Sequence, residues 1–333
     1  MAVVRGDVLT TPHAQTFIDG VVALSQTMTE VTPTQLNQAI PVDAQRARIF
    51  GTAAQMNQPL SWWDLFCWWH LLAMSTPAAT GNRAHRGPIF LPWHRMYLRR
   101  LEEAIQTVMG DDDFALPYWD WAADGELDPD VQDDAPVWSL IGPARGQVTQ
   151  GTVGQLRVRL YFYVEDQRLY VMAPRPIWRT GQQGAPTLPD RNDQARTLDD
   201  DVYDGPEWRD QNTDSFRNKL EGFQDPTEPP PPARRPGPWM HNRVHVWVGG
   251  DMAPGSSPND PVFWLNHCNV DRLWEAWMQR NDRTYLPGPG QGPTGQRIDD
   301  PMVSVVWPSL RPADVLDPTE SGLDWYRYDQ VPA

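Results

Sequence analysis

The sequence predicts a mainly α-helical protein with long loops and one small β-hairpin. Four segments repeat apolar residues at helical spacing, whereas one segment alternates apolar and polar residues as a strand does. The 34 prolines among 333 residues predict much stiff, irregular loop between these elements. With 40% hydrophobic residues the chain can bury a sizeable core, and we expect residues 1–333 to form a single domain.

Helical spacing of apolar residues defines four segments: residues 17–28, 63–73, 94–108 and 263–278. The start of the last helix is the best defined, because Asp260 can cap it and Pro261 stands in the first turn, where a proline is tolerated. In three of the four predicted helices the apolar face includes a histidine, so these helices place imidazoles in apolar surroundings.

The predicted hairpin runs from Leu156 to Met172. It reads LRVRLYFYV, then EDQ, then RLYVM, so that two alternating segments flank a short polar turn. We expect most of residues 173–212 and 280–325 to be long ordered loop. The four prolines at Pro229–Pro232 favour an extended, unpaired segment.

Charge and composition narrow the classes of partner. Lys and Arg number 28 against 43 Asp and Glu, and a net charge of −15 argues against a nucleic acid or an anionic membrane as partner. Since no signal peptide or membrane-spanning run is recognisable, we expect a cytoplasmic location, or export through a partner protein. The 17 tryptophans predict a large aromatic core, in which a few could shape a ligand pocket. We expect Cys67 and Cys268 to be reduced and packed.

Two of the seven histidines, His241 and His245, are four residues apart in PWMHNRVHVWVGGDM. On a helix they would lie on the same face and could reach one metal ion, although two histidines on a polar face would give the same spacing. No Glu follows the first histidine, so the zinc-protease form of the motif is excluded.

Four further histidines stand in strongly apolar sequence: His70, His85, His94 and His267. One such histidine alone is usually a satisfied core residue, but four of them beside the spaced pair indicate a metal site. A single catalytic zinc would leave half of the six unexplained, and a carboxylate-bridged di-iron bundle would need Glu-x-x-His helices that the sequence lacks. Six nitrogen ligands without a thiolate or a carboxylate favour a pair of copper ions.

Two long motifs around these histidines give the chain a family resemblance. HRGPIFLPWHRMYLRRLE at His85–Glu102 and DPVFWLNHCNVD at Asp260–Asp271 resemble the two copper-binding signatures of the tyrosinase family, the binuclear type 3 copper proteins. Further likeness lies in LPYWDW, FRNKLEG and VGGDM, and in Arg5 with the YRY at Tyr326–Tyr328. The resemblance implies a four-helix core around two copper ions.

By position, the resemblance implies His70, His85 and His94 as ligands of the first copper and His241, His245 and His267 as ligands of the second. As in bacterial members, no Cys lies between His70 and His85, so we expect His85 to have no thioether link. Because the chain resembles the central domain alone, we expect no masking C-terminal domain and no need for proteolytic activation. We also expect the loop GDMAPGSSPN to line the entrance of the site.

The activity that the resemblance implies is oxidation of phenols by O2 to o-quinones, with a small phenolic substrate and a copper-loading chaperone as partners. Glu221 and Asn242 match the residues proposed in the family to hold a water that removes the proton of a monophenol. The alternative roles are a helix-surface carboxylate for Glu221 and a helix-start residue bonded to its own backbone for Asn242. Asp271 either orients a neighbouring group or pairs with Arg95 or Arg272 in the core.

Three other functions stay open from the sequence. The first is an o-diphenol or o-aminophenol oxidase without monophenol hydroxylation. The second is a haemocyanin-like oxygen binder that has the same six histidines and little turnover. The third is a copper-binding structural relic. Colour formation with a catechol separates the last two from an enzyme.

Overall fold

The structure, a computed structural model, describes residues 2–41, 44–75, 82–210, 215–223, 239–320 and 324–332. Over these ranges the chain is mainly helical, as predicted. The helices are α1 (Ala14–Gln26), α2 (Pro33–Ala39), α3 (Ala53–Met56), α4 (Trp62–Met74), α5 (Phe90–Met109), α6 (Trp121–Gly125), α7 (Pro136–Ile141), α8 (Arg191–Leu198), α9 (Phe216–Glu221), α10 (Met240–Val248) and α11 (Pro261–Arg280).

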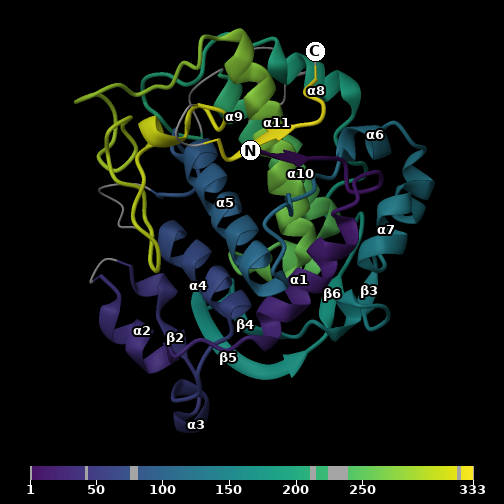
Figure 1. The fold of residues 1–333 in the computed structure, drawn as a ribbon, viewed down its shortest axis with the longest axis vertical. Helices are drawn as coiled ribbons and strands as arrows, with labels where there is room; N and C mark the ends of the chain where they lie inside the picture. The colour runs from purple at the N-terminus through teal and green to yellow at the C-terminus, as the bar shows by residue number, and fades with distance from the viewer. Residues whose placement is uncertain are drawn as a thin grey trace.

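The core is a group of packed helices with α5 at its centre (Figure 1). Helix α5 contacts α1 and α11; α1 also contacts α4, and α10 contacts α11. The four helices expected from apolar spacing are α1, α4, α5 and α11, so this part of the prediction is confirmed. Helix α11 starts as expected, with the carboxylate of Asp260 accepting the N–H of Val262 at 3.0 Å and Pro261 in the first turn.

Helix α4 is apolar on nearly every side, which explains its place inside the molecule. Its sequence, WWDLFCWWHLLAM, leaves only the first and last residues half-buried, while all the residues between them are buried. The helix begins at a capping box in which Ser61 and Asp64 satisfy each other's backbone N–H groups. This burial fixes the position of His70 on the helix.

Small sheets surround the helices. The predicted hairpin is present as β4 (Val158–Tyr163) and β5 (Arg168–Arg175), which pair antiparallel, and β2 (Ile49–Phe50) adds to β5 in parallel. A second pair joins β3 (Gly146–Val148) to β6 (Ile177–Arg179) in antiparallel register. The third pairs β1 (Val3–Arg5) with β7 (Tyr326–Tyr328) in parallel, so the two ends of the chain lie side by side.

The expected loop at residues 173–212 contains two elements that were not predicted, β6 and α8. Helix α8 has few apolar residues, so it shows no amphipathic period, but Asp190 and Asp193 form a capping box at its start. Residues 280–320 are largely without regular structure, as expected, apart from a short 3₁₀ helix at Pro312–Val315. Pro229–Pro232 lies outside the described residues.

The interior is aromatic, as the tryptophan count predicted. Nine tryptophans are fully buried: Trp63, Trp69, Trp93, Trp119, Trp121, Trp247, Trp264, Trp274 and Trp277. Cys67 and Cys268 are free and buried, which confirms the expectation for both thiols. Among the described residues, no helix combines the length and the apolar character needed to cross a bilayer.

Candidate metal centre

The structure gathers the six histidines singled out in the sequence at the middle of the helical core. His70 lies on α4, His94 on α5 and His267 on α11. His241 and His245 lie one turn apart on α10, as their spacing predicted, and His85 precedes α5 in a loop. The ring centroids of His94 and His267 are 4.1 Å apart and nearly parallel, so the first and second predicted ligand sets meet directly.

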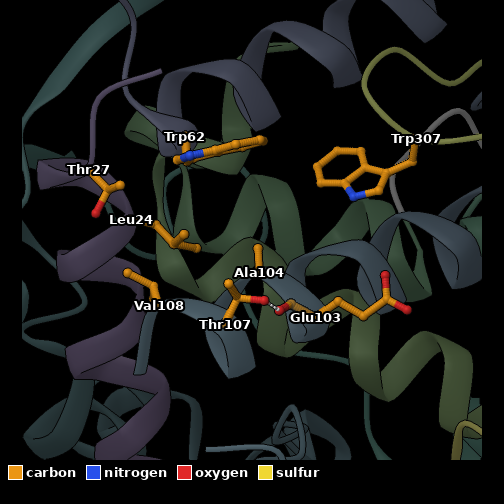
Figure 2. A pocket seen from close by; sticks show the side chains of 8 residues that line it. All are labelled: Leu24, Thr27, Trp62, Glu103, Ala104, Thr107, Val108 and Trp307. Atoms are coloured by element: carbon orange, nitrogen blue, oxygen red, sulfur yellow. Dashed lines mark hydrogen bonds between the residues drawn. The ribbon is translucent and has the colours of Figure 1, made fainter. Parts of the chain in front are cut away.

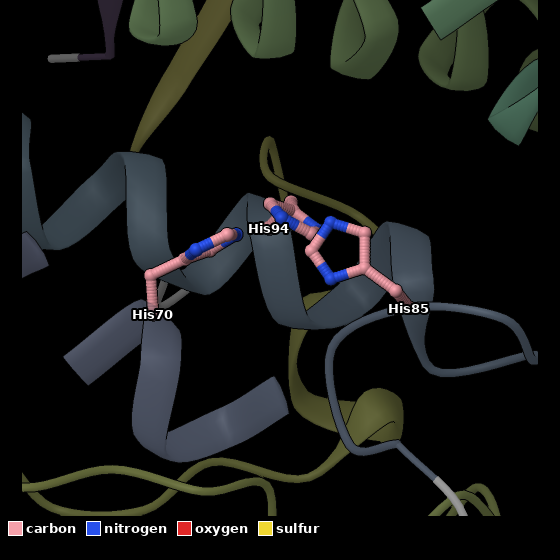
Figure 3. A group of neighbouring side chains, drawn as sticks. All are labelled: His70, His85 and His94. Carbon is pink, nitrogen blue, oxygen red and sulfur yellow. The ribbon is translucent and has the colours of Figure 1, made fainter. Parts of the chain in front are cut away.

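The first group consists of His70, His85 and His94, whose rings turn toward one another in Figure 3. One ring nitrogen from each lies within 4.8 Å of the others. The ring centroid of His85 is 5.0 Å from that of His70 and 4.8 Å from that of His94. This is the trio expected to hold the first copper ion.

The second group differs in one member from the expected set. His85, His241 and His267 place one ring nitrogen each within 4.8 Å of the others, and Nε2 of His241 lies 3.0 Å from Nε2 of His267. His245 lies beside them, with its ring centroid 4.5 Å from that of His241 and 5.7 Å from that of His267. His85 therefore stands between the two groups.

Backbone carbonyls fix the direction of four of the rings. Nδ1 of His70 lies 2.8 Å from the carbonyl oxygen of Gly255, and Nδ1 of His94 lies 2.8 Å from that of Phe90. On α10, Nδ1 of His241 lies 3.2 Å from the carbonyl oxygen of Glu221, and Nδ1 of His245 lies 2.7 Å from that of Met252. A carbonyl can only accept a hydrogen bond, so Nδ1 carries the proton and donates in each case. The lone pair is then on Nε2, which is the nitrogen that faces the cluster.

The Nε2 atoms are well suited to bind metal ions. Nε2 of His70, of His94 and of His245 is buried without a hydrogen-bond partner in the part of the chain that the structure describes. Burial lowers the pKa of His70 to about 3 and that of His245 to about 4, so both imidazoles are neutral near pH 7. Buried, neutral, unpartnered nitrogens cost free energy unless a ligand uses them. These donors fit copper ions, which readily take imidazole ligands.

The loop at residues 250–259, which we expect to line the entrance, contacts the histidine cluster through its backbone. It includes two short 3₁₀ turns, Gly250–Met252 and Ser257–Asn259. Its carbonyls at Met252 and Gly255 accept the Nδ1 protons of His245 and His70. The loop thus orients one imidazole of each predicted ligand set.

Glu221 is a buried carboxylate and not the helix-surface residue that the sequence also allowed. One carboxylate oxygen accepts the backbone N–H of Arg86 at 2.6 Å, and the other accepts from Arg217 Nη1 at 3.0 Å. Burial raises the pKa of Glu221 to about 7, although Arg217 opposes this shift. Arg217, four residues earlier on the same helix face, was not predicted as a partner of Glu221, although this spacing alone favours an ion pair.

Asn242 lies on the same side of His241 as Glu221. Its side-chain oxygen is 3.1 Å from Nδ1 of His241, which also faces the main-chain oxygen of Glu221. Helix α9 and helix α10 approach so closely here that a Cβ on Gly222 would be 3.0 Å from Cβ of Asn242. The main-chain oxygen of Glu221 and the side-chain oxygen of Asn242 therefore meet at the same ring nitrogen of His241, whereas the carboxylate of Glu221 is bonded to Arg86 and Arg217.

Asp271 has the core-paired role that was one of its two expected readings. Its carboxylate accepts from Arg95 Nε at 2.6 Å and from Arg5 Nη1 at 3.3 Å. The hydroxyl of Tyr328 donates to it at 2.6 Å. Burial alone would raise the pKa of Asp271, but Arg95 and Arg5 outweigh it, and the pKa lies below its usual value. This ion pair joins α5 and α11, the helices of His94 and His267.

Comparison with known proteins gives these observations a family. The common central domain of tyrosinase matches residues 60–280. The chain is 38% identical to a tyrosinase of Streptomyces lincolnensis over 298 residues, which cover 85% of this chain and 95% of that protein. It is 34% identical to the grixazone synthase of Streptomyces griseus over 302 residues, which cover 80% and 90%.

Solved structures agree on the fold. A polyphenol oxidase from Thermothelomyces thermophila matches with a TM-score of 0.66 and 19% identity over 98% of this chain and 88% of that one. A functional unit of octopus hemocyanin matches with a TM-score of 0.51 and 16% identity over 99% and 68%. At these identities the likeness concerns the fold alone.

A helical core that turns neutral histidine nitrogens toward one another defines a histidine-ligated metalloprotein. The chain belongs to the tyrosinase family, and it is a copper oxidoreductase of the tyrosinase type.

Proposed function

We propose that this protein oxidises phenols with O2 to o-quinones, including hydroxylation of monophenols, at a site of two copper ions. His70, His85 and His94 hold the first ion, and His241, His245 and His267 hold the second. The single observation that carries the proposal is the cluster of six imidazoles, four of them buried and two half-buried, with ring nitrogens turned toward one another. The tyrosinase relatives, at 36% to 38% identity over 85% of this chain, support phenols as substrates.

The copper ions, when bound, supply the redox chemistry with O2. The chain's part is to fix the ligands, and it does so through the carbonyls of Gly255, Phe90, Glu221 and Met252. Because these carbonyls hold the Nδ1 protons, each ring keeps Nε2 directed at the cluster before any ion arrives. Rings that are preorganised in this way lose little conformational freedom on binding.

Glu221 and Asn242 serve as the proton-removing pair for a monophenol. A carboxyl with a pKa of about 7 exchanges protons readily at neutral pH, which suits a general base. Asn242 supplies an amide beside His241 that can orient a water next to the ring. O-diphenols lose their protons more easily than monophenols, so the pair matters most for monophenols.

The matched test is oxygen uptake by Glu221→Gln and Asn242→Ala with tyramine and with a catechol. We expect monophenol turnover to fall about 100-fold, the scale of a lost general base, while catechol turnover changes little. Glu103→Gln, a change on the outer face of α5, is the control and leaves both rates unchanged. An equal loss on both substrates would contradict the role of the pair.

A second candidate function is oxidation of o-diphenols or o-aminophenols without monophenol hydroxylation. The observation that favours it is the state of Glu221, whose two carboxylate oxygens are already engaged by Arg86 N and Arg217. A base held by two donors removes a proton less readily. Wild-type protein that oxidises a catechol and an o-aminophenol but leaves tyramine unchanged would establish this candidate.

A further inference from the structure

We propose that a row of tryptophans carries single oxidising equivalents from the histidine cluster to the surface, which protects the metal-binding histidines when no phenol is bound. The row consists of Trp93, Trp69, Trp307 and Trp62. The inference rests on an oxidising metal centre at the cluster, as in the proposed function, but it does not depend on which phenol is the substrate.

The inner end of the row touches two of the predicted copper ligands. The ring centroid of Trp93 is 4.9 Å from that of His94 and 5.9 Å from that of His70. Trp93 is fully buried on α5. An electron that leaves this indole therefore has a direct path to either imidazole.

The middle of the row is continuous. The ring centroids of Trp93 and Trp69 are 5.8 Å apart, and those of Trp69 and Trp307 are 5.2 Å apart in a stacked arrangement. Adjacent π systems at such separations exchange electrons efficiently, because the orbitals of neighbouring rings nearly touch. Helices α4 and α5 hold the first two rings, so their spacing is set by the rigid core.

The outer end opens to solvent. Trp307 and Trp62 are both half-buried, with ring centroids 5.9 Å apart. They line a groove of about 290 Å³ together with Leu24, Ala104 and Val108. Figure 2 shows the two indoles in the upper half of this groove, above the aliphatic side chains. A small reductant from solvent can reach the last two rings of the row.

The hydrogen bonds favour indoles over the nearby phenol as carriers. The hydroxyl of Tyr97 donates to the carbonyl of Phe66 at 2.7 Å, and a carbonyl cannot take the proton that a tyrosine must release when it is oxidised. Trp69 and Trp93 both donate their indole N–H to the carbonyl of Val303 at 2.9 Å. An indole can lose an electron and keep its proton, so its oxidation needs no base.

A side branch of the aromatic core does not lead to the surface. The ring centroid of Tyr97 is 4.6 Å from that of Trp264, which is 5.8 Å from that of Trp63. Trp63 is only 2% exposed, and its N–H donates to the carbonyl of Asn259. Tyr97 joins this branch to the row, and since it cannot release its proton to the carbonyl of Phe66, the branch takes up no oxidising equivalent.

The electron balance of the step is simple. One electron moves from Trp93 to the cluster, and electrons from Trp69 and then Trp307 refill each vacancy in turn. The vacancy on Trp307 or Trp62 takes one electron from a small reductant of the enediol or o-diphenol class, which releases one proton to water. The oxidant would be the copper ions and O2 of the proposed function, which the six histidines would hold and which the electron from Trp93 would reduce by one equivalent.

The test treats copper-loaded protein with hydrogen peroxide in the absence of phenol and maps oxidised residues by peptide mass spectrometry. Copper-free protein gives the baseline. We expect Trp307 and Trp62 to be oxidised more than Trp178, although Trp178 is 46% exposed. Ascorbate, as the reductant, should suppress this oxidation.

Two variants sharpen the result. Trp307→Phe breaks the row at its solvent end, so the oxidised fraction of Trp93, His94 and His70 should rise severalfold. Trp178→Phe is the matched control and should leave the pattern as in the wild type. Oxidation that follows exposure, or a pattern that Trp307→Phe leaves unchanged, would overturn this proposal alone. Protein that binds no copper would overturn both this proposal and the proposed function, which measured copper content reveals.

Discussion

The two histidine groups lie within one cluster, yet their surroundings differ. The first group touches a tryptophan, since Trp93 lies against both His70 and His94, whereas Phe263 packs against rings of both groups, His70 and His267. The second group faces polar atoms, with Asn242 and the backbone of Glu221 at His241. The side with Trp93 is the one at which we propose electron transfer, and the side with Asn242 is the one at which we propose proton removal.

This difference separates two requirements of an oxidase. Holding the rings in place requires rigidity, and α4 and α5 provide it by burying His70 and His94 of the first group among packed aromatic side chains. Removing a substrate proton requires a titratable group, and in the proposed function this group is Glu221, which lies beside Arg217. Changes on the first side should thus affect both substrates equally, whereas changes on the second side should discriminate between them.

The largest effect is expected from His94→Ala. This change removes a proposed copper ligand and one of the two stacked rings, His94 and His267, at which the groups meet. Both monophenol and diphenol oxidation should therefore fall to background together with the copper content. Metal analysis and oxygen uptake measure the two losses. Full copper content with intact catechol turnover would contradict the assignment of His94.

The next effect concerns pH and belongs to the second side alone. Because burial raises the pKa of Glu221 to about 7, its carboxylate form increases as the pH rises from 6 to 8, and monophenol turnover should increase with it. In Glu221→Gln this rise should disappear, while the catechol profile stays as in the wild type. A rise that persists in the variant would assign the titration to another group.

A smaller effect concerns the stability of the copper-free protein in acid. His70 and His245 have a pKa of about 3 and about 4 in the folded chain against 6.5 when unfolded, because burial disfavours the charged rings. Between pH 6.5 and 4 the unfolded chain binds more protons than the folded chain, so the free energy of unfolding falls as the pH falls. For each histidine the loss amounts to about 1.4 kcal/mol for every unit by which its folded and unfolded pKa values differ. Thermal unfolding of copper-free protein at a series of pH values measures the fall, and a flat profile would mean that the rings are not held neutral.

The smallest effect is expected from Ser61→Ala at the start of α4. Loss of the cap should lower the free energy of unfolding by about 1 kcal/mol. Since the position of His70 is set by the packing of the whole helix, copper content and turnover should not change. Urea unfolding beside metal analysis tests both statements, and a loss of copper would show that the cap itself positions His70.

The sequence predicted the helices and the histidines well because both leave local signals. Apolar spacing revealed α1, α4, α5 and α11, and the Asp260 cap located the start of α11. Helix α8 was missed because a short polar helix has no apolar period, and its capping box was its only signal.

The contacts that orient the site were beyond local reasoning. The carbonyls of Gly255 and Met252 meet His70 and His245 only after the loop folds onto α4 and α10, and any residue can supply a carbonyl. In the same way, the place of His85 between the two groups depends on how the helices pack. The ion pair between Arg217 and Glu221 did leave a signal, because the two residues are four apart in FRNKLEG. This spacing was overlooked because Glu221 was expected to act as a base.

The central claim is that six histidines hold two copper ions that oxidise phenols. The most direct test is to titrate the copper-free protein with copper while oxygen uptake is followed with tyramine and with a catechol. The account predicts that uptake rises with added copper and reaches a plateau at two ions per chain, with both substrates consumed. A plateau at one ion, or copper binding without any uptake, would contradict it.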